Sequence, residues 1–323
     1  MQGKLIYFSD SEPGITRRRC GQGFTYFAPD GTRINDTAVR ERLVGLAVPP
    51  AYTDVWMCPS PDGHLQATGR DARARKQYRY HPQWQEEQAQ VKFDQLIEFG
   101  LALPRLRRRL RRDLAQDAGE QTFALAAATT LIDRAALRVG NPIYAAENGS
   151  YGALTLRNKH VKLNERHIAL RFNAKGGKRV RRQLADRTLA RVLNKISDLP
   201  GARLLSWLDG NGVAQAISSD MLNRYIADAA AVETVTAKTF RTWAGTLAAF
   251  EVGAAGDARI KDMASAAAKV LHNTPKIARD SYIHPRVIAL ADMTAPDITP
   301  VVKDDLRVAE QRLLGFLQSG TGA

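Results

Sequence analysis

The pattern of apolar residues changes at His81–Pro82, and this change constrains the fold more than any other feature of the chain. In residues 26–81, turn-forming Pro, Asp and Gly residues separate short runs such as 54–58 (DVWMC), a rhythm that predicts several strands of a small sheet. We expect a helix over Asp36–Val48 to interrupt this sheet, because Asp is a good N-cap residue. After residue 82 apolar residues recur one helical turn apart, so the remainder is predicted to be mainly helical.

One part of the second half departs from the helical pattern. Three short segments, Ala153–Arg157, Ile168–Phe172 and Arg179–Gln183, alternate in polarity and predict a three-stranded sheet with hairpin loops. With 323 residues the chain is long enough for two domains. We therefore predict an α+β protein in which residues 1–85 form a small β-rich domain. Residues 86–323 are expected to form a larger, mainly α-helical domain that contains the short antiparallel hairpin sheet.

The charge of the chain is concentrated in three segments. Lys and Arg number 47 against 33 Asp and Glu, and this net charge of +14 predicts a polyanionic partner, either nucleic acid or an anionic membrane. Residues 70–79, 105–112 and 175–191 together hold 18 basic and 2 acidic residues, so the rest of the chain is close to neutral. The segment 105–112 could equally be the solvated outer face of a helix, since Leu106 and Leu110 mark its inner face.

Several classes of protein are disfavoured by what the sequence lacks. No apolar run approaches the roughly 18 residues that cross a bilayer, and the first residues form no signal peptide, so we expect a soluble intracellular protein. Cys20 and Cys58 are far apart and suggest neither a disulfide framework nor a zinc site. There is no phosphate-binding glycine motif and no metal-ligand spacing of His or Asp, so neither ATP nor a metal cofactor is expected. Phosphodiester chemistry without a metal needs a nucleophile, cations and an acid, which Tyr, Arg and Lys can supply.

Short signatures that contain these residue types follow one another in the second half. They are 138–141 (RVGN), 151–161 (YGALTLRNKHV), 172–178 (FNAKGGK), 238–243 (KTFRTW) and 272–285 (HNTPKIARDSYIHP). In the last of them, Thr274–Pro275 predicts the N-cap and first turn of a short helix that carries Tyr282 two turns later. This ordered set resembles the type IB DNA topoisomerases, in the short poxvirus-like form found in bacteria. The resemblance covers nearly the whole chain, because 63–67 (GHLQA) and 69–81 also look like that family's DNA-clamping domain.

The resemblance implies a role for each matching residue. Tyr282 matches the nucleophile that forms a 3′-phosphotyrosyl intermediate, and Lys175 matches the general acid. Arg138 and Arg241 match the arginines that hold the non-bridging oxygens, since a planar guanidinium suits two oxygens at once. Asn273 lies where many relatives carry a histidine, and the adjacent His272 could share its role. The matches to DNA-contacting residues are Arg75, Tyr78, Tyr80, Tyr144, Lys178 and Arg179.

The resemblance also implies an activity and a partner. The enzyme would relax supercoiled DNA without ATP, a metal or another cofactor, because the phosphotyrosyl bond conserves the energy of the broken phosphodiester. Its partner would be double-stranded DNA rather than a membrane. The protein would act as a monomeric clamp in the cytoplasm, associated with the nucleoid.

Other interpretations stay open at this level. Taken singly, Tyr282 could be a packing residue, Arg138 a partner of a helix C-terminus, and Lys175 a solvated hairpin tip. A tyrosine recombinase uses a similar set of residues, although it usually has His at the position of Lys238 and a helical N-terminal domain. A DNA-binding protein that has lost catalysis would share the basic segments. Relaxation of plasmid DNA in EDTA distinguishes these possibilities.

Overall fold

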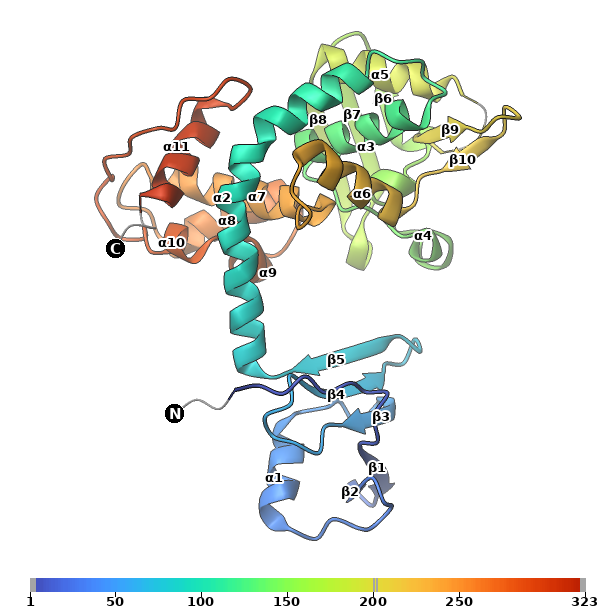
Figure 1. Cartoon of the computed structure of the whole chain (residues 1–323), viewed down its shortest axis with the longest axis vertical. Helices are drawn as coiled ribbons and strands as arrows, with labels where there is room; N and C mark the ends of the chain where they lie inside the picture. Colours follow the sequence, from blue (N-terminus) through green and yellow to red (C-terminus); the bar gives the residue numbers. More distant parts are fainter. Residues whose placement is uncertain (1–3, 200, 202, 320–323) are drawn as a thin grey trace. The chain divides into compact units, whose positions relative to one another are not determined.

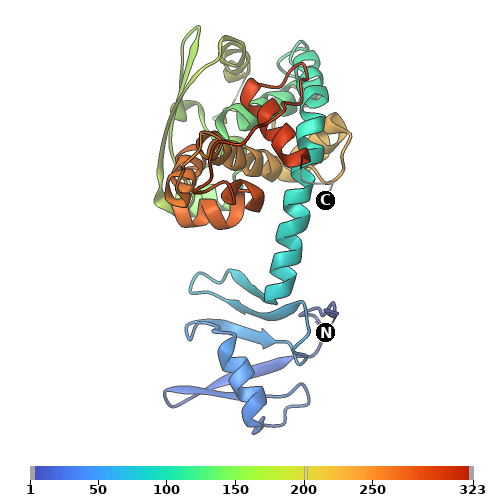
Figure 2. The ribbon, with the colours of Figure 1, turned by 90° about the vertical axis from the view of Figure 1, so that its left-hand side faces the viewer.

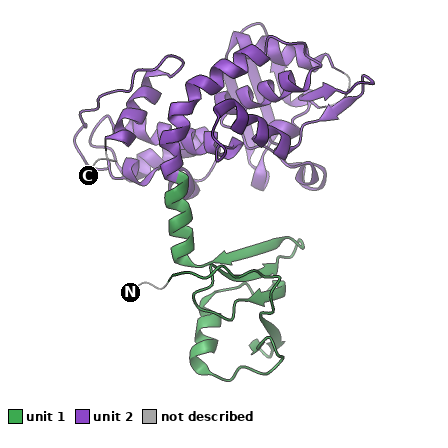
Figure 3. Ribbon diagram, in the orientation of Figure 1, with its two compact units in different colours: residues 1–92 green, residues 93–323 purple. Residues whose placement is uncertain are grey.

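The computed structural model describes residues 4–199, 201 and 203–319. Two compact units can be distinguished, residues 1–92 and residues 93–323 (Figure 3). The division falls inside a long helix, α2 (Pro82–Asp113), which begins in the first unit and continues into the second. The protein is α+β, as the sequence predicts, with a β-rich first unit and a mainly helical second unit (Figure 1).

The first unit is built on a five-stranded antiparallel sheet of order β2-β1-β3-β4-β5 (Figure 1). Its strands are β1 (Ile15–Cys20), β2 (Gly23–Phe27), β3 (Thr53–Met57), β4 (Leu65–Arg70) and β5 (Lys76–Tyr80). Helix α1 (Thr37–Gly45) begins behind Asp36, whose carboxylate accepts a hydrogen bond from the N–H of Val39 at 2.9 Å. The predicted cap is therefore confirmed, although the helix ends at Gly45 rather than Val48.

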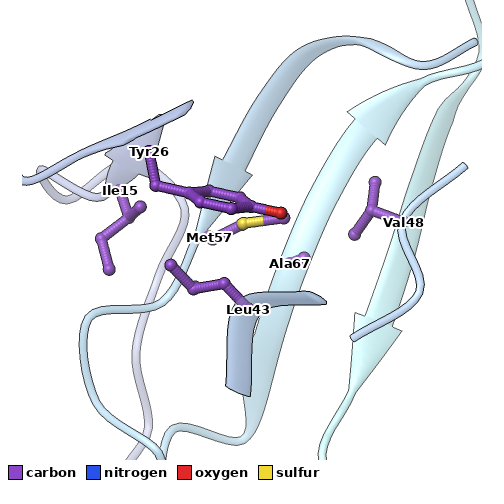
Figure 4. Packing of buried hydrophobic residues seen from close by; sticks show 6 residues of the cluster. All are labelled: Ile15, Tyr26, Leu43, Val48, Met57 and Ala67. Carbon is purple, nitrogen blue, oxygen red and sulfur yellow. The ribbon is translucent and has the colours of Figure 1, made fainter. Parts of the chain in front are cut away.

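Apolar side chains from the strands and from α1 form the core of this unit (Figure 4). The buried members are Ile15, Tyr26, Leu43, Val48, Met57 and Ala67. Strand β5 lies at the edge of the sheet, and most of its side chains are exposed. The edge of the sheet therefore presents exposed Lys, Tyr and Arg side chains.

The second unit combines helices with two small antiparallel sheets (Figures 1 and 2). One sheet has the order β6-β7-β8 and the other pairs β9 with β10. The strands are β6 (Val161–Leu163), β7 (His167–Asn173), β8 (Arg179–Ala185), β9 (Ser206–Leu208) and β10 (Ala214–Ala216). The helices after α2 are α3 (Gln121–Ala135), α4 (Pro142–Asn148), α5 (Arg187–Ser197), α6 (Ser219–Ala230), α7 (Ala237–Gly253), α8 (Ile260–Leu271), α9 (Pro275–Tyr282), α10 (Pro285–Ile288) and α11 (Val308–Gln318).

The predicted strand Ala153–Arg157 is wrong. Its first three residues form a buried 3₁₀ turn, η1 (Ala153–Thr155), and β6 takes the third place in the sheet. The reason lies in the backbone, because the N–H of Ala153 donates to the carbonyl of Arg138 at 2.8 Å. This N–H therefore bonds the segment that follows α3 and is not free to join the hydrogen bonds of a sheet.

The second basic segment, 105–112, is not simply a solvated face. Arg107 is buried and forms ion pairs with Asp133 at 3.0 Å and with Glu310 at 2.8 Å. Its neighbours on α2 are more exposed. Arg109 and Arg112 pair with the buried Asp113, and Arg108 and Arg111 pair with the partly exposed Asp305. The buried ion cluster of Arg107, Asp133 and Glu310 joins α2, α3 and α11, so part of the charge excess is structural.

Candidate active site

Arg241 lies in the first turns of α7, which begins with a capping arrangement between Thr236 and Thr239. The side chain is buried, with 4% exposure, and one of its terminal nitrogens donates to the carbonyl of Leu271 at 3.1 Å. The other terminal nitrogen donates to the carbonyl of Ala136. Its Nε is buried and has no hydrogen-bond partner among the described residues. Burial, followed by the charge of Arg138, lowers the pKa of Arg241 to about 10, so the group remains a cation at neutral pH.

Arg138 follows the end of α3, where Ala136 adopts a left-handed conformation and ends the helix. The backbone of Arg138 is fixed by the adjoining turn η1, and Gly152 allows this close approach. A Cβ on Gly152 would lie 2.5 Å from the Arg138 carbonyl oxygen, so a larger residue could not be accommodated without movement. The guanidinium of Arg138 donates to Oδ1 of Asn273 and so connects this loop to the end of α8.

Asn273 and His272 form the connection between α8 and α9. Because the Asn273 oxygen already accepts from Arg138, its amide Nδ2 is left as a buried donor with no partner within the described ranges. His272 ends α8 with a φ of 50° and lines a small cavity together with Arg138 and Arg241. Burial, then the charge of Arg182, lowers the pKa of His272 below its usual range, so it is neutral at physiological pH.

Tyr282 is the last residue of α9. The predicted cap of this helix is confirmed, since the hydroxyl of Thr274 accepts from the N–H of Ile277 at 3.3 Å. The half-buried Tyr282 ring lies beside the guanidinium of Arg241, with 5.3 Å between the guanidinium carbon and the ring centre. The short helix thus presents a phenol next to a buried cation.

The structure therefore brings together four of the five predicted catalytic residues: Tyr282, Arg138, Arg241 and Asn273. Arg241 lies beside the Tyr282 ring, the charge of Arg138 acts on Arg241, and Arg138 in turn donates to Asn273. Such a set can hold the non-bridging oxygens of a phosphodiester and stabilise the extra charge of its pentacoordinate state. Between 4 and 319, leaving out the undescribed positions, no group of three or more His, Cys, Asp or Glu side chains could hold a metal ion.

The fifth residue, Lys175, lies apart from this group. It starts a short turn, η3 (Lys175–Gly177), in the loop that joins β7 to β8, and its side chain is exposed. Lys178 and Arg179 belong to the same exposed loop and strand start, and the charge of Lys178 also acts on His272. The hairpin is thus adjacent to the site, but within the described part of the chain no hydrogen bond joins Lys175 to the other four residues.

The predicted DNA-contacting residues outside the hairpin are on two separate surfaces. In the first unit, Tyr78 and Tyr80 of β5 stack at 6.0 Å with an angle of 9° between their rings, and both are exposed. Arg75 precedes them and is held by Asp71 at 2.6 Å. In the second unit, Tyr144 projects from α4 with 42% exposure.

Sequence reasoning missed two residues that lie near the predicted site residues, Tyr7 through His64 beside Tyr80 and Arg182 beside His272. Tyr7, with 76% exposure, stacks on His64 with ring centres 4.2 Å apart, and no local sequence signal relates residues so distant in the chain. Arg182 is partly buried and donates to the carbonyl of Val270 at 2.9 Å, next to His272. Arg182 could have been found from the sequence, because alternation along the strand places it on the same face as the buried Val180.

Two protein-family models match the chain. The N-terminal domain of bacterial DNA topoisomerase IB matches residues 23–71, and the catalytic core of eukaryotic DNA topoisomerase I matches residues 81–272. The DNA topoisomerase 1B of Acanthamoeba polyphaga mimivirus is 32% identical over 238 residues, which are 72% of this chain and 70% of the relative. These matches define the chain as a DNA topoisomerase, an isomerase. More narrowly, it belongs to the type IB DNA topoisomerases, with the N-terminal domain of their bacterial form.

Solved structures with a similar arrangement include the XerH site-specific recombinase. Its post-cleavage complex with a palindromic difH substrate is 15% identical, with a TM-score of 0.40 over 56% of this chain and 47% of that one. Its pre-cleavage complex is 16% identical, with a TM-score of 0.40 over 57% and 49% of the two chains. The chain thus spans about half the length of the recombinase chains that it matches.

Proposed function

We propose that Tyr282 is the nucleophile with which this topoisomerase cleaves DNA. Its phenolic oxygen forms a bond to the scissile phosphorus while its proton passes to solvent, and the bond from phosphorus to the 5′ oxygen breaks. The 5′ oxygen takes a proton from Lys175 and leaves as a free hydroxyl. Religation is the reverse attack, in which Lys175 regains its proton and Tyr282 is released. One phosphodiester is exchanged for another, so the cycle requires no ATP.

The observation that supports this assignment most strongly is a pair of unused donors, one on Arg241 beside the Tyr282 ring and one on Asn273, which accepts from Arg138. Arg241 Nε and Asn273 Nδ2 are both buried and lack partners in the described part of the chain. A buried donor without a partner costs about 1–3 kcal/mol, so these two suggest that an absent group accepts from them. A phosphodiester oxygen fits, because the neighbouring charges are the cations Arg138 and Arg241.

We assign the general-acid role to Lys175 on the strength of its position in the β7–β8 loop. An exposed ammonium on a hairpin can enter a groove of bound DNA, where the 5′ oxygen departs. Proton donation of this kind contributes roughly 10²- to 10⁴-fold in rate. The same loop carries Lys178 and Arg179, which would neutralise phosphates beside the cleavage site.

We further propose that residues 1–85 act as a DNA-clamping domain and residues 86–323 as the catalytic domain of a monomer on double-stranded DNA. Tyr78, Tyr80 and Arg75 support this, because they form an exposed aromatic and basic edge on β5. Tyr144 would contact DNA from α4. Among the described residues, none of the helices has the length and apolar character needed to span a bilayer. The proposed substrate is the double-stranded DNA of the nucleoid, in the cytoplasm.

The test is relaxation of supercoiled plasmid in EDTA without ATP, compared between the wild type and Tyr282→Phe. The wild type should relax the plasmid and form a covalent protein–DNA adduct. The variant should do neither, since only the attacking oxygen is removed, while its affinity for a DNA duplex stays within about twofold. An adduct formed by Tyr282→Phe would show that another residue is the nucleophile. Synapsis-dependent strand exchange without relaxation would instead favour a recombinase.

A further inference from the structure

We propose that Gly245 and Thr246, here called the α7 seat, position Tyr282 for attack on the phosphate. The proposal rests on the assignment of Tyr282 as the nucleophile and adds positioning residues to it. Neither residue carries a charge or faces the cavity that Arg138 and Arg241 line. Their contribution is to fix the backbone from which the phenol projects.

The hydroxyl of Thr246 makes hydrogen bonds to the backbone of the last residue of α9 and to the backbone just after it. Its Oγ1 donates to the carbonyl of Tyr282 at 3.0 Å and accepts from the N–H of His284 at 3.1 Å. The Tyr282 carbonyl is at a helix C-terminus, where no later turn of α9 supplies a donor. Thr246 is fully buried, so water cannot replace either bond. One side chain therefore satisfies both groups and fixes the turn that leads from α9 to α10.

Gly245 permits the approach of the two helices at this point. A Cβ on Gly245 would lie 2.9 Å from the carbonyl oxygen of Tyr282 and 3.0 Å from its Cβ. It would also lie 2.8 Å from Cδ1 of Leu271, at the end of α8. Any larger residue would have to displace α9, and the Tyr282 phenol would move with it.

The position of the seat along α7 connects it to the phosphate-binding residue Arg241. Residues four apart lie on the same face of a helix, so Arg241 and Gly245 face α9 together. The guanidinium carbon of Arg241 is 5.3 Å from the Tyr282 ring centre. The single helix α7 therefore positions both Arg241, which would hold the phosphate, and the backbone of the nucleophile Tyr282. Misplacement of a reacting group by about 1 Å can cost roughly 10²-fold in rate.

The experiment compares Thr246→Val, Thr246→Ser and Thr129→Val in single-turnover cleavage of a suicide duplex. Valine keeps the shape of threonine but removes the hydroxyl, whereas serine keeps it. Thr129 is the matched control, because it is also fully buried and its hydroxyl donates only to the carbonyl of Leu125 within α3. Thr246→Val should cleave at least about 10-fold more slowly with unchanged DNA affinity. Thr246→Ser and Thr129→Val should cleave at nearly the wild-type rate.

A substrate with a 5′-bridging sulfur identifies the step that is affected. Its thiolate leaves without a proton, so it should restore cleavage in Lys175→Ala but not in Thr246→Val, whose defect is on the nucleophile's side. Gly245→Ala should show the same persistent defect, and it gives an independent test if Thr246→Val folds poorly. The proposal is overturned if Thr246→Val matches Thr129→Val, or if the sulfur restores its rate. Failure of the Tyr282 assignment would be seen separately, as an adduct in Tyr282→Phe.

Discussion

Arg107 and Arg241 are both buried in the second unit, but their surroundings differ in the charge that faces them. Arg107 lies between two carboxylates, those of Asp133 and Glu310. Arg241 contacts the carbonyls of Ala136 and Leu271, a phenol ring and a second cation. Burial alone would lower the pKa of Arg107, but hydrogen bonds to Glu310 and the charge of Asp133 raise it above the ordinary value. For Arg241 burial and Arg138 act in the same direction, and the pKa falls to about 10.

We interpret Arg107 as a structural cation, and we propose that Arg241 binds the anionic phosphate of the substrate. A buried charge is tolerated when it is paired and hydrogen-bonded, as in the ion cluster of Arg107. An unpaired buried cation lowers the stability of the empty protein, and perturbed groups of this kind are concentrated at functional sites. Four experiments test this distinction between the buried cations.

Arg107→Ala should have the largest effect of the four, a loss of stability. The substitution leaves the buried Asp133 carboxylate without Arg107 and leaves Glu310 with Arg307 as its remaining cation, which should reduce the free energy of unfolding by about 3–5 kcal/mol. Urea denaturation measures this. The cleavage rate per folded molecule should not change, and a slower rate at full folding would show that the cluster also acts on the site.

Arg241→Ala should reduce the cleavage rate strongly and the stability only slightly. Cleavage should slow by about 10²- to 10³-fold, as for loss of one donor to a developing oxyanion, when measured under single-turnover conditions. Stability should fall less than in Arg107→Ala, because an uncompensated charge is removed with the side chain. A loss of stability as large as that of Arg107→Ala would mean that Arg241 is mainly structural.

The paired cluster should also make stability depend on pH. Burial alone would raise the pKa of Glu310, but hydrogen bonds from Arg107 and Arg307 lower it from 4.5 to about 2. Its contribution is therefore complete above about pH 4.5 and is lost as the pH falls toward 2, a loss of about 3 kcal/mol. In Glu310→Gln, urea titrations across this range should show a shallower decline than in the wild type. If stability depends on pH equally in both proteins, the ionised Glu310 is not the source of this dependence.

Lys175→Ala extends the comparison to an exposed cation. Because its side chain is exposed, the variant should unfold at the wild-type temperature, yet cleave about 10²-fold more slowly. A 5′-bridging sulfur should restore the rate. Failure of this rescue would argue that Lys175 holds the phosphate rather than protonating the leaving oxygen.

Local signals in the sequence predicted local structure well. The caps at Asp36 and Thr274 were confirmed because a side-chain acceptor and the N–H groups that it serves are only three residues apart. The segment Ala153–Arg157 was predicted wrongly, because its alternation in polarity does not indicate that the N–H of Ala153 bonds the carbonyl of Arg138. Residues joined across long distances in the chain, such as Tyr7 with His64, leave no periodic pattern.

The α+β class, the basic segments and the family could be predicted from the sequence, because they depend on periodicity, composition and the order of short motifs. Which arginines are paired follows only from the packing of segments that are distant in the chain. Arg107 lies in the basic segment 105–112, and nothing in that segment indicates that Arg107 is buried between two carboxylates while its neighbours are more exposed. Whether a carboxylate from α3 or α11 reaches a buried guanidinium depends on how distant segments pack, and the energy of a charge depends on the groups within a few ångströms of it.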